Sequence, residues 1–142
     1  MIFKIKLKKV KINDSQASKF LFTLRNKKYV RVNSINTKKI KFTEHKKWFE
    51  VFLKKKNIIY IIYVKKIMIG YIRLEKIQDI FYTSWAVLKK YQKLGFAKKS
   101  LKVATRNKNY KYKSLIKKNN LASISIAENA SFEYKYKRKN IL

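Results

Sequence analysis

The hydrophobic positions at the front of the chain follow first a strand period and then a helix period. Bulky apolar residues alternate with Lys at residues 3–7, the two-residue period of a strand with one face in water. Between residues 17 and 24 apolar side chains recur at three- and four-residue spacing, which predicts an amphipathic helix. Asp14 or Ser15 is placed to cap this helix, and we expect it to end near Asn26.

A second amphipathic helix is expected after the polar stretch that leads to Phe42. Thr43 is placed to cap it, and Glu44 near its start suits the positive end of the helix dipole. The lysines at residues 54–56 suit the negative end in the same way. The expected apolar side of this helix consists of Trp48, Phe49, Phe52 and Leu53.

The rest of the chain alternates expected strands with single helices. Residues 57–64 and 67–75 predict two strands joined by a tight turn, because both are rich in β-branched and aromatic residues. The further expected elements are a strand at 80–88, a helix after Gly95, a short strand near 112–116, a helix capped by Asn120 and a final strand at 131–139. This order predicts the α/β (α+β) class, with a mixed central sheet and helices on both faces.

Length and composition are those of one folded domain, residues 1–142. Compact domains are commonly about 100 to 150 residues long. This chain has 142 residues, of which 46% are hydrophobic and 15% aromatic, more than a disordered polycation carries. Cys is absent and His45 is the only His, so ligands for a thiolate or His-rich metal site are lacking and we expect no metal.

No part of the sequence is expected to insert into a membrane. The longest uncharged stretches, residues 57–64 and 80–88, are far shorter than the roughly 20 apolar residues that cross a bilayer. In the first residues charged side chains alternate with bulky apolar ones, so the apolar block of a signal peptide is absent. We therefore expect a soluble cytoplasmic protein, as a monomer or homodimer.

A net charge of +31 is the property that most strongly suggests a nucleic-acid partner. Only five of the 38 basic residues are Arg, however, and Ile, Asn, Tyr and Phe are also abundant while Pro is absent. This composition is typical of an AT-rich genome, which raises Lys at every exposed position and not on one binding face. We therefore expect no specific nucleic-acid partner, with selected binding of polyanions as the alternative.

Residues 84–101 place an apolar strand, a short polar loop, a Gly and a helix in succession. Gly95 is one of two Gly in the chain, and a Gly at such a junction lets backbone amides approach an anion at the positive end of the helix. This arrangement suits a pyrophosphate. The alternative is that Gly95 merely relieves a tight turn.

Within that segment, Gln92, Gly95 and Ala97 resemble the acetyl-coenzyme A loop of the GNAT acyltransferase superfamily. In that family the loop has Gln or Arg, two residues, Gly, one residue, and then Gly or Ala. The resemblance implies a single-domain GNAT fold. It also implies an N-acetyltransferase that moves an acetyl group from acetyl-coenzyme A (acetyl-CoA) to a primary amine.

A second element of the family lies near the end of the chain. Asn120 and Ser123 are similar to the family's Asn-x-x-Ser helix, which ends in a Gly-Phe pair whose Gly is Ser131 here. In the family the strand before the loop parts from its neighbour, and its free backbone groups bind the pantetheine arm. The residues implied to bind acetyl-CoA are Trp85, Ala86, Val87, Gln92, Lys93, Leu94, Gly95, Phe96, Ala97, Asn120 and Ser123.

The front half of the chain, in residues 24–34 and 42–52, resembles the branch of the family that acetylates nucleotide-linked amino sugars. That resemblance implies a role in surface glycan synthesis. The acceptor-binding residues it implies are Arg25, Asn26, Arg31, His45 and Trp48. For Trp48 the alternative is a place in the core stripe of its helix, and for His45 a hydrogen-bonded structural role.

The proton chemistry departs from the family pattern. Many relatives have a Glu on the strand before the loop and a Tyr in the last helix, where this chain has Phe81, Tyr82 and Thr83 in the first region and Ala127 in the second. Glu75 and Tyr82 remain the candidate catalytic residues, with a solvated charge and a packed ring as the alternatives. The open function classes are an amino sugar acetyltransferase, an acetyltransferase of protein or ribosomal-protein amines, a basic nucleic-acid-binding module, and a GNAT fold that binds coenzyme A without turnover.

Overall fold

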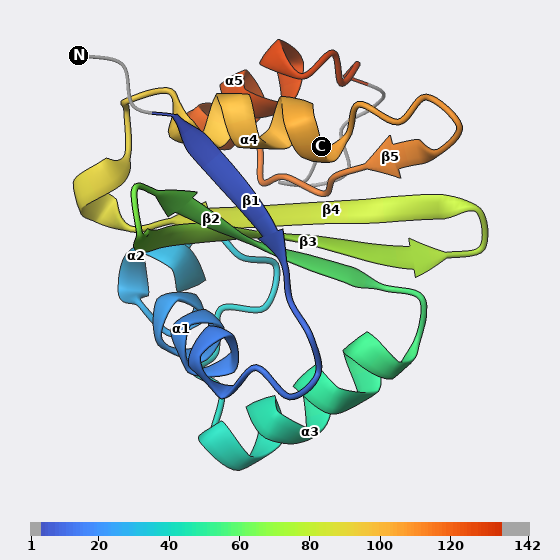
Figure 1. Ribbon diagram of the computed structural model, residues 1–142. Coiled ribbons are helices and arrows are strands. Elements are labelled where there is room, and N and C mark those ends of the chain that lie inside the picture. Colours follow the sequence, from blue (N-terminus) through green and yellow to red (C-terminus); the bar gives the residue numbers. More distant parts are fainter. Residues whose placement is uncertain (1–3, 135–142) are drawn as a thin grey trace.

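In the computed structural model, which describes residues 4–134, one five-stranded sheet separates two layers of helices (Figure 1). Strand neighbours follow the order β1-β2-β3-β4-β5, and every pair is antiparallel except the parallel pair of β4 and β5. The strands are β1 (Ile5–Lys9), β2 (Ile58–Val64), β3 (Ile67–Ile77), β4 (Ile80–Val87) and β5 (Lys111–Lys113). The helices are α1 (Ser15–Arg25), α2 (Lys28–Arg31), α3 (Phe42–Lys54), the 3-10 turn η1 (Lys89–Tyr91), α4 (Phe96–Ala104) and α5 (Leu121–Asn129).

Helices cover both faces of the sheet, as the sequence predicts. Figure 1 shows α1, α2 and α3 on one side, here called the α1 face, and α4 and α5 on the other, the α4 face. Strand β2 supplies both cores because its successive side chains point to opposite faces of the sheet. Ile59 and Ile61 pack with the helices of the α1 face, whereas Ile62 packs with the α4 face. A strand buried on both faces is expected to be continuously apolar, which explains the sequence of residues 57–64.

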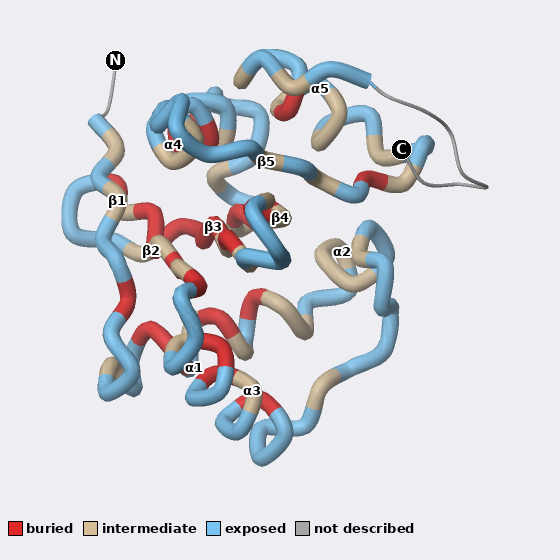
Figure 2. The backbone as a smooth tube through the Cα atoms, turned by 90° about the vertical axis from the view of Figure 1, so that its right-hand side faces the viewer, coloured by how far each residue is buried: buried red, intermediate tan, exposed pale blue. Residues whose placement is uncertain are grey.

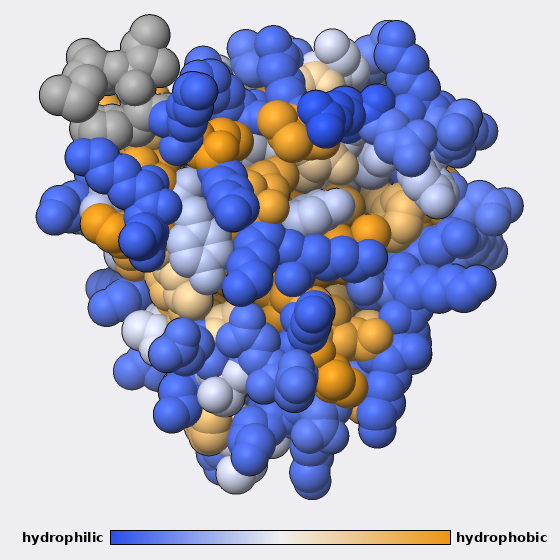
Figure 3. All heavy atoms as spheres, viewed as in Figure 1, coloured by the Kyte–Doolittle hydropathy of each residue, from blue (hydrophilic) through white to orange (hydrophobic). Residues whose placement is uncertain are grey.

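The buried residues follow this layering. Figure 2 shows them along the strands and on the sides of the helices that face the sheet. Hydrophilic side chains are spread over the whole visible face of the molecule in Figure 3, and the hydrophobic patches between them are small. Among residues 4–134, no helix has both the length and the apolar character needed to span a membrane.

The helix caps agree with the sequence in part. Asp14 caps α1, and its Oδ1 accepts a hydrogen bond from the Ala17 amide at 3.0 Å, which confirms the predicted start. The prediction that Thr43 caps the second helix is wrong, because α3 already begins at Phe42 and its capping residue is Lys41. The short helix α2 lies in the stretch expected to be irregular, where four residues with no buried side chain leave no periodic signal.

The end of the chain departs further from expectation. Residues 131–134 form no strand, and the remainder of the strand predicted at 131–139 lies outside the described residues, as does Phe3. A helix terminus occupies this place instead: the Phe132 amide donates to Ala127 O at 3.0 Å and the Ser131 amide to Glu128 O at 2.9 Å. Ser131 has φ +69, which is the left-handed conformation that such a terminus requires and that Gly adopts most easily.

Replacing Ser131 by Gly is expected to stabilise the protein by about 1 kcal/mol, because Gly has no Cβ to strain at positive φ. The free energy of unfolding from urea denaturation measures this effect. Ser125→Gly is the matched control, since the exposed Ser125 lies within α5 and Gly there should cost about 0.5 kcal/mol. Equal losses of stability in both variants would contradict the backbone strain assigned to Ser131.

Candidate active site

The loop after β4 ends at Gly95, the capping residue of α4. Gly95 has φ +83, and a Cβ built on it would meet no protein atom within 4 Å. The backbone conformation therefore requires Gly, while the space in front of it is open. Lys99 N–H donates the first helical hydrogen bond, to Gly95 O at 3.1 Å. The amides of Phe96, Ala97 and Lys98 consequently have no helical acceptor and are available to a ligand.

Positive charge surrounds these amides. Residues 88–104 contain no Asp or Glu. Within six residues of Gly95 on either side, the exposed lysines are Lys89, Lys90, Lys93, Lys98 and Lys99. Together with the positive end of the α4 dipole, they make the loop chemically suited to an anion of high charge density.

Three contacts fix the shape of the loop. The Gln92 side chain donates through Nε2 to Val87 O at 3.1 Å, which ties the loop to the end of β4. Lys93 adopts a left-handed conformation with φ +63 and reverses the chain direction. Phe96 is buried in the core of the α4 face and anchors the first turn of the helix. The amides are therefore held in place before any ligand arrives.

The backbone of β4 has free groups on its outer edge. In an antiparallel pair, residues that exchange hydrogen bonds with the partner strand alternate with residues that do not. Leu88 N–H donates to Ile69 O at 2.8 Å, so Ala86 is the next residue bonded toward β3. The backbone groups of Trp85 and Val87 consequently point away from β3, toward β5.

Strand β5 does not reach these groups. It pairs with β4 only from Ile80 to Tyr82, and Ser114 Oγ then donates to Thr83 O at 2.8 Å. Beyond this point no described residue of β5 is paired with β4. Since the Gln92 side chain occupies Val87 O, the open stretch of edge presents the N–H and C=O of Trp85 and the N–H of Val87. The two strands part at the place where the family resemblance puts the pantetheine arm.

Two long-range hydrogen bonds connect α2 to the segments on either side of this open edge. Tyr29 Oη in α2 accepts from the Lys89 amide at 3.0 Å, which joins α2 to the loop. Lys117 Nζ donates to Val32 O at 3.0 Å and joins the segment after β5 to the end of α2. Sequence reasoning missed both, because no local pattern signals contacts between residues 60 and 85 positions apart.

The sequence profile of the acetyltransferase (GNAT) family matches residues 19–132. The chain belongs to this family. The matched residues include strands β2 to β5, the loop and α5, and the family assignment makes the protein an acetyl-CoA-dependent acyltransferase. The open space at Gly95, the unpaired amides of α4 and the parted edge of β4 fit that cosubstrate.

Solved structures share the fold at low sequence identity. A domain from Methanocaldococcus jannaschii has a TM-score of 0.83 and 19% identity, covering 99% of this chain and 96% of that one. RimL, a ribosomal L7/L12 α-N-protein acetyltransferase in complex with coenzyme A, has a TM-score of 0.78 and 14% identity over 93% of this chain and 81% of its own. Spermidine N-acetyltransferase from Vibrio cholerae, in complex with CoA and spermine, has a TM-score of 0.78 and 15% identity, covering 93% of this chain and 82% of its own. No curated protein sequence matches the chain.

The second GNAT element lies at the start of α5. Asn120 Oδ1 accepts from the Ser123 amide at 3.2 Å, so the Asn-x-x-Ser spacing forms a helix cap as predicted for Asn120. Ala127, where many relatives have a Tyr, is buried. Helix α5 therefore contributes no phenol at that position.

Three of the predicted acceptor-binding residues form hydrogen bonds with backbone groups near the end of α1 and in the loop before α3. The Arg25 guanidinium donates to Asn36 O at 2.6 Å, and Arg31 Nε donates to Asn26 O at 3.0 Å. Asn26 exchanges two hydrogen bonds with the backbone of Ile40, both of 2.8 Å. The structure thus brings Arg25, Asn26 and Arg31 together, with much of their bonding capacity used on the backbone.

The candidate catalytic pair lies on the α1 face of β3 and β4. Glu75 stands opposite Tyr82 in the strand register, and both side chains are half-buried. Arg73 stands opposite Ser84, two residues closer to the loop along each strand. The ring of Trp48 in α3 packs against the Arg73 guanidinium. The structure therefore places Glu75, Tyr82 and Trp48 on one face, with Arg73 among them.

His45 lies apart from this group, between α1 and α3. It is 4% exposed, its Nε2 is 3.0 Å from Ser18 Oγ, and its ring is 5.4 Å from that of Phe22 and 6.3 Å from that of Phe42. Burial lowers the pKa of His45, and the hydrogen bond with Ser18 opposes that effect in part. The imidazole is thus held in its neutral form.

This burial predicts a pH-dependent stability. Because the unfolded chain binds a proton at the ordinary His pKa of about 6.5 and the folded state binds it only at lower pH, the free energy of unfolding should fall as pH drops below about 6.5. Urea denaturation at pH 7.5 and 5.5 measures the difference. His45→Gln should lower the slope of the free energy of unfolding against pH by an amount equivalent to at most one bound proton. An unchanged slope in that variant would refute the role assigned to His45.

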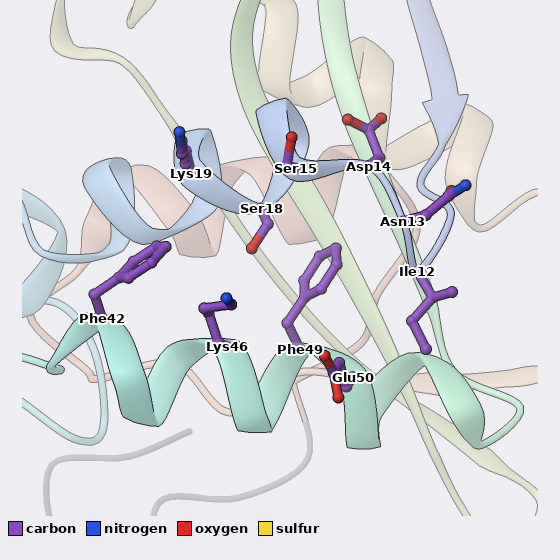
Figure 4. A pocket seen from close by; sticks show the side chains of 10 residues that line it. All are labelled: Ile12, Asn13, Asp14, Ser15, Ser18, Lys19, Phe42, Lys46, Phe49 and Glu50. Carbon is purple, nitrogen blue, oxygen red and sulfur yellow. The ribbon is translucent and has the colours of Figure 1, made fainter.

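A shallow hollow of about 240 Å³ lies near His45 between α1 and α3. Figure 4 shows Ser18 of α1 pointing toward α3, from which Phe42, Lys46 and Phe49 line the other side of the hollow. None of its lining residues belongs to β4, β5 or the loop before α4. The hollow is therefore separate from the loop and strand edge of the candidate acetyl-CoA site.

Proposed function

We propose that this GNAT enzyme acetylates the primary amine of a nucleotide-linked amino sugar in the cytoplasm, as a step of surface glycan synthesis. The observation that carries the proposal is the open edge of β4 beside the unpaired amides of α4. The choice of acceptor is supported by the resemblance of residues 24–34 and 42–52 to the branch that acts on such sugars. These residues lie on the α1 face, opposite the helix that begins at the loop.

The loop and the strand edge divide the binding of acetyl-CoA between them. The segment from Gln92 to Ala97 holds the pyrophosphate through backbone amides and nearby lysines, while the free groups of Trp85 and Val87 bind the pantetheine arm. When bound, acetyl-CoA supplies the activated acetyl group. An outward amide of β4 stabilises the negative charge that develops beside it.

Proton removal is assigned to the α1 face. Glu75 accepts the proton of the acceptor ammonium, and Tyr82, its neighbour in the register, positions the amine or a water between them. A Glu carboxylate is the stronger base of the two at neutral pH. This pair takes the place of the Glu that many relatives have within the strand before the loop.

An amine screen tests the proposal, with release of the CoA thiol as the measurement and acetyl-CoA without acceptor as the background. A nucleotide-linked amino sugar should give a kcat/KM at least about tenfold above that of peptides with a free N-terminus. A higher kcat/KM for the peptides would instead identify the enzyme as an acetyltransferase of protein amines. Acetyl-CoA binding without turnover of any amine would indicate a GNAT fold that has lost catalysis.

A further inference from the structure

Arg73 packs against two aromatic rings on the α1 face of the sheet. Its Cζ lies 5.0 Å from the centre of the Trp48 ring and 5.9 Å from that of Phe52. Cation–π contacts of this kind fix a guanidinium in one orientation. In the strand register Arg73 stands opposite Ser84, the residue before the open edge of β4. Since side chains of such cross-strand neighbours are about 5 Å apart, Arg73 lies beside the path of an acceptor that approaches this edge.

Within the described residues, part of the Arg73 guanidinium is left without a hydrogen-bond partner. Arg73 Nε and Arg25 Nη1 are both buried and have no hydrogen-bond partner. Burial lowers the pKa of Arg25, Tyr71 opposes this, and the charges of Arg73 and Arg31 lower it further. A buried donor without a partner is costly, so the protein tolerates guanidinium groups here whose hydrogen-bonding capacity its own side chains do not fill.

The exposed part of Arg73 is its outer end. The residue is only partly buried although Nε is fully covered, and β3 is an inner strand of the sheet. Its terminal nitrogens are not among the buried atoms that lack a partner, and neither donates a hydrogen bond within the described residues, so we infer that they are open to solvent. They offer two parallel donors, the geometry that matches the paired oxygens of a phosphate or carboxylate.

We propose that Arg73 binds an anionic group of the acceptor, a phosphate or a carboxylate, and so selects amines that carry one. This inference rests on the proposed function and names the residue that discriminates between acceptors. It predicts the opposite preference from that of a polyamine acetyltransferase, because a polyamine would bring more positive charge to Arg73, Arg25 and Arg31. Spermidine should accordingly be a poor acceptor.

The test compares glucosamine with two acceptors that share its skeleton, glucosamine 6-phosphate and a 2-amino uronic acid. The wild-type enzyme should favour at least one of the charged amines over glucosamine. Arg73→Gln should raise KM for that amine by about 10- to 100-fold and leave KM for glucosamine and the affinity for acetyl-CoA unchanged. The amine with the larger response identifies phosphate or carboxylate as the group bound.

Two further variants keep the result interpretable. Arg106→Gln removes an exposed guanidinium remote from this face and should change nothing. Arg73→Lys keeps the charge without the paired donors and should give an intermediate KM. Equal losses for charged and neutral amines in Arg73→Gln, or a preference for spermidine, would overturn the inference while the enzyme remains an acetyltransferase. Failure of the wild type to bind acetyl-CoA would overturn the proposed function itself.

Discussion

Gly95→Glu is expected to lower the affinity for acetyl-CoA by about 100-fold or more while the protein remains folded. The new carboxylate would extend from Gly95, at φ +83, into the open space in front of the α4 amides, where the cosubstrate's diphosphate is proposed to bind. Two negative charges about 4 Å apart repel each other by several kcal/mol in the partly shielded surroundings of a loop. The rise in melting temperature caused by acetyl-CoA measures the loss, because a ligand stabilises the folded state according to its affinity.

Gly95→Asn is the matched control for backbone strain. Asn tolerates the left-handed conformation better than other residues with a side chain, and it adds no charge. It should lower stability slightly and retain most of the acetyl-CoA shift. If Gly95→Glu keeps the shift as well, the diphosphate binds elsewhere and the proposed site is wrong.

Gly70→Ala is expected to destabilise the protein by about 3 kcal/mol and to weaken acetyl-CoA binding. A Cβ on Gly70 would lie 2.5 Å from Ala86 O and 3.1 Å from Val87 Cα, and neither backbone atom can yield as the end of a flexible side chain would. Relief requires β4 to move away from β3. That movement would displace the strand whose outer edge is proposed to bind the pantetheine arm.

Ile69→Val provides the comparison for Gly70→Ala. Ile69 is fully buried next to Gly70, and the loss of one methylene should cost about 1 kcal/mol without moving β4. Urea denaturation gives the stabilities, and titration of acetyl-CoA gives the affinities. Normal affinity in Gly70→Ala would show that the position of β4 does not control the site.

Much of the fold could be predicted because its signals are local. The cap at Asp14, the hairpin of β2 and β3, and the helix after Gly95 all follow from short patterns of apolar, capping and Gly residues. The predictions failed where a local pattern has two outcomes. The alternation at residues 131–134 suits a strand, but the hydrogen bonds of Ser131 and Phe132 close the end of α5 instead.

By itself, then, the sequence determined the order of the strands and longer helices from β1 to α5 and the loop that marks the GNAT family, since both depend on residues that are neighbours in the chain. The tertiary structure alone decided which groups of β4 are free, because strand register and the short reach of β5 set them. It also decided that Arg73 lies over Trp48 and beside Arg25, three residues from three separate elements. Such contacts depend on how the elements pack, and no period, cap or spacing along the chain encodes them.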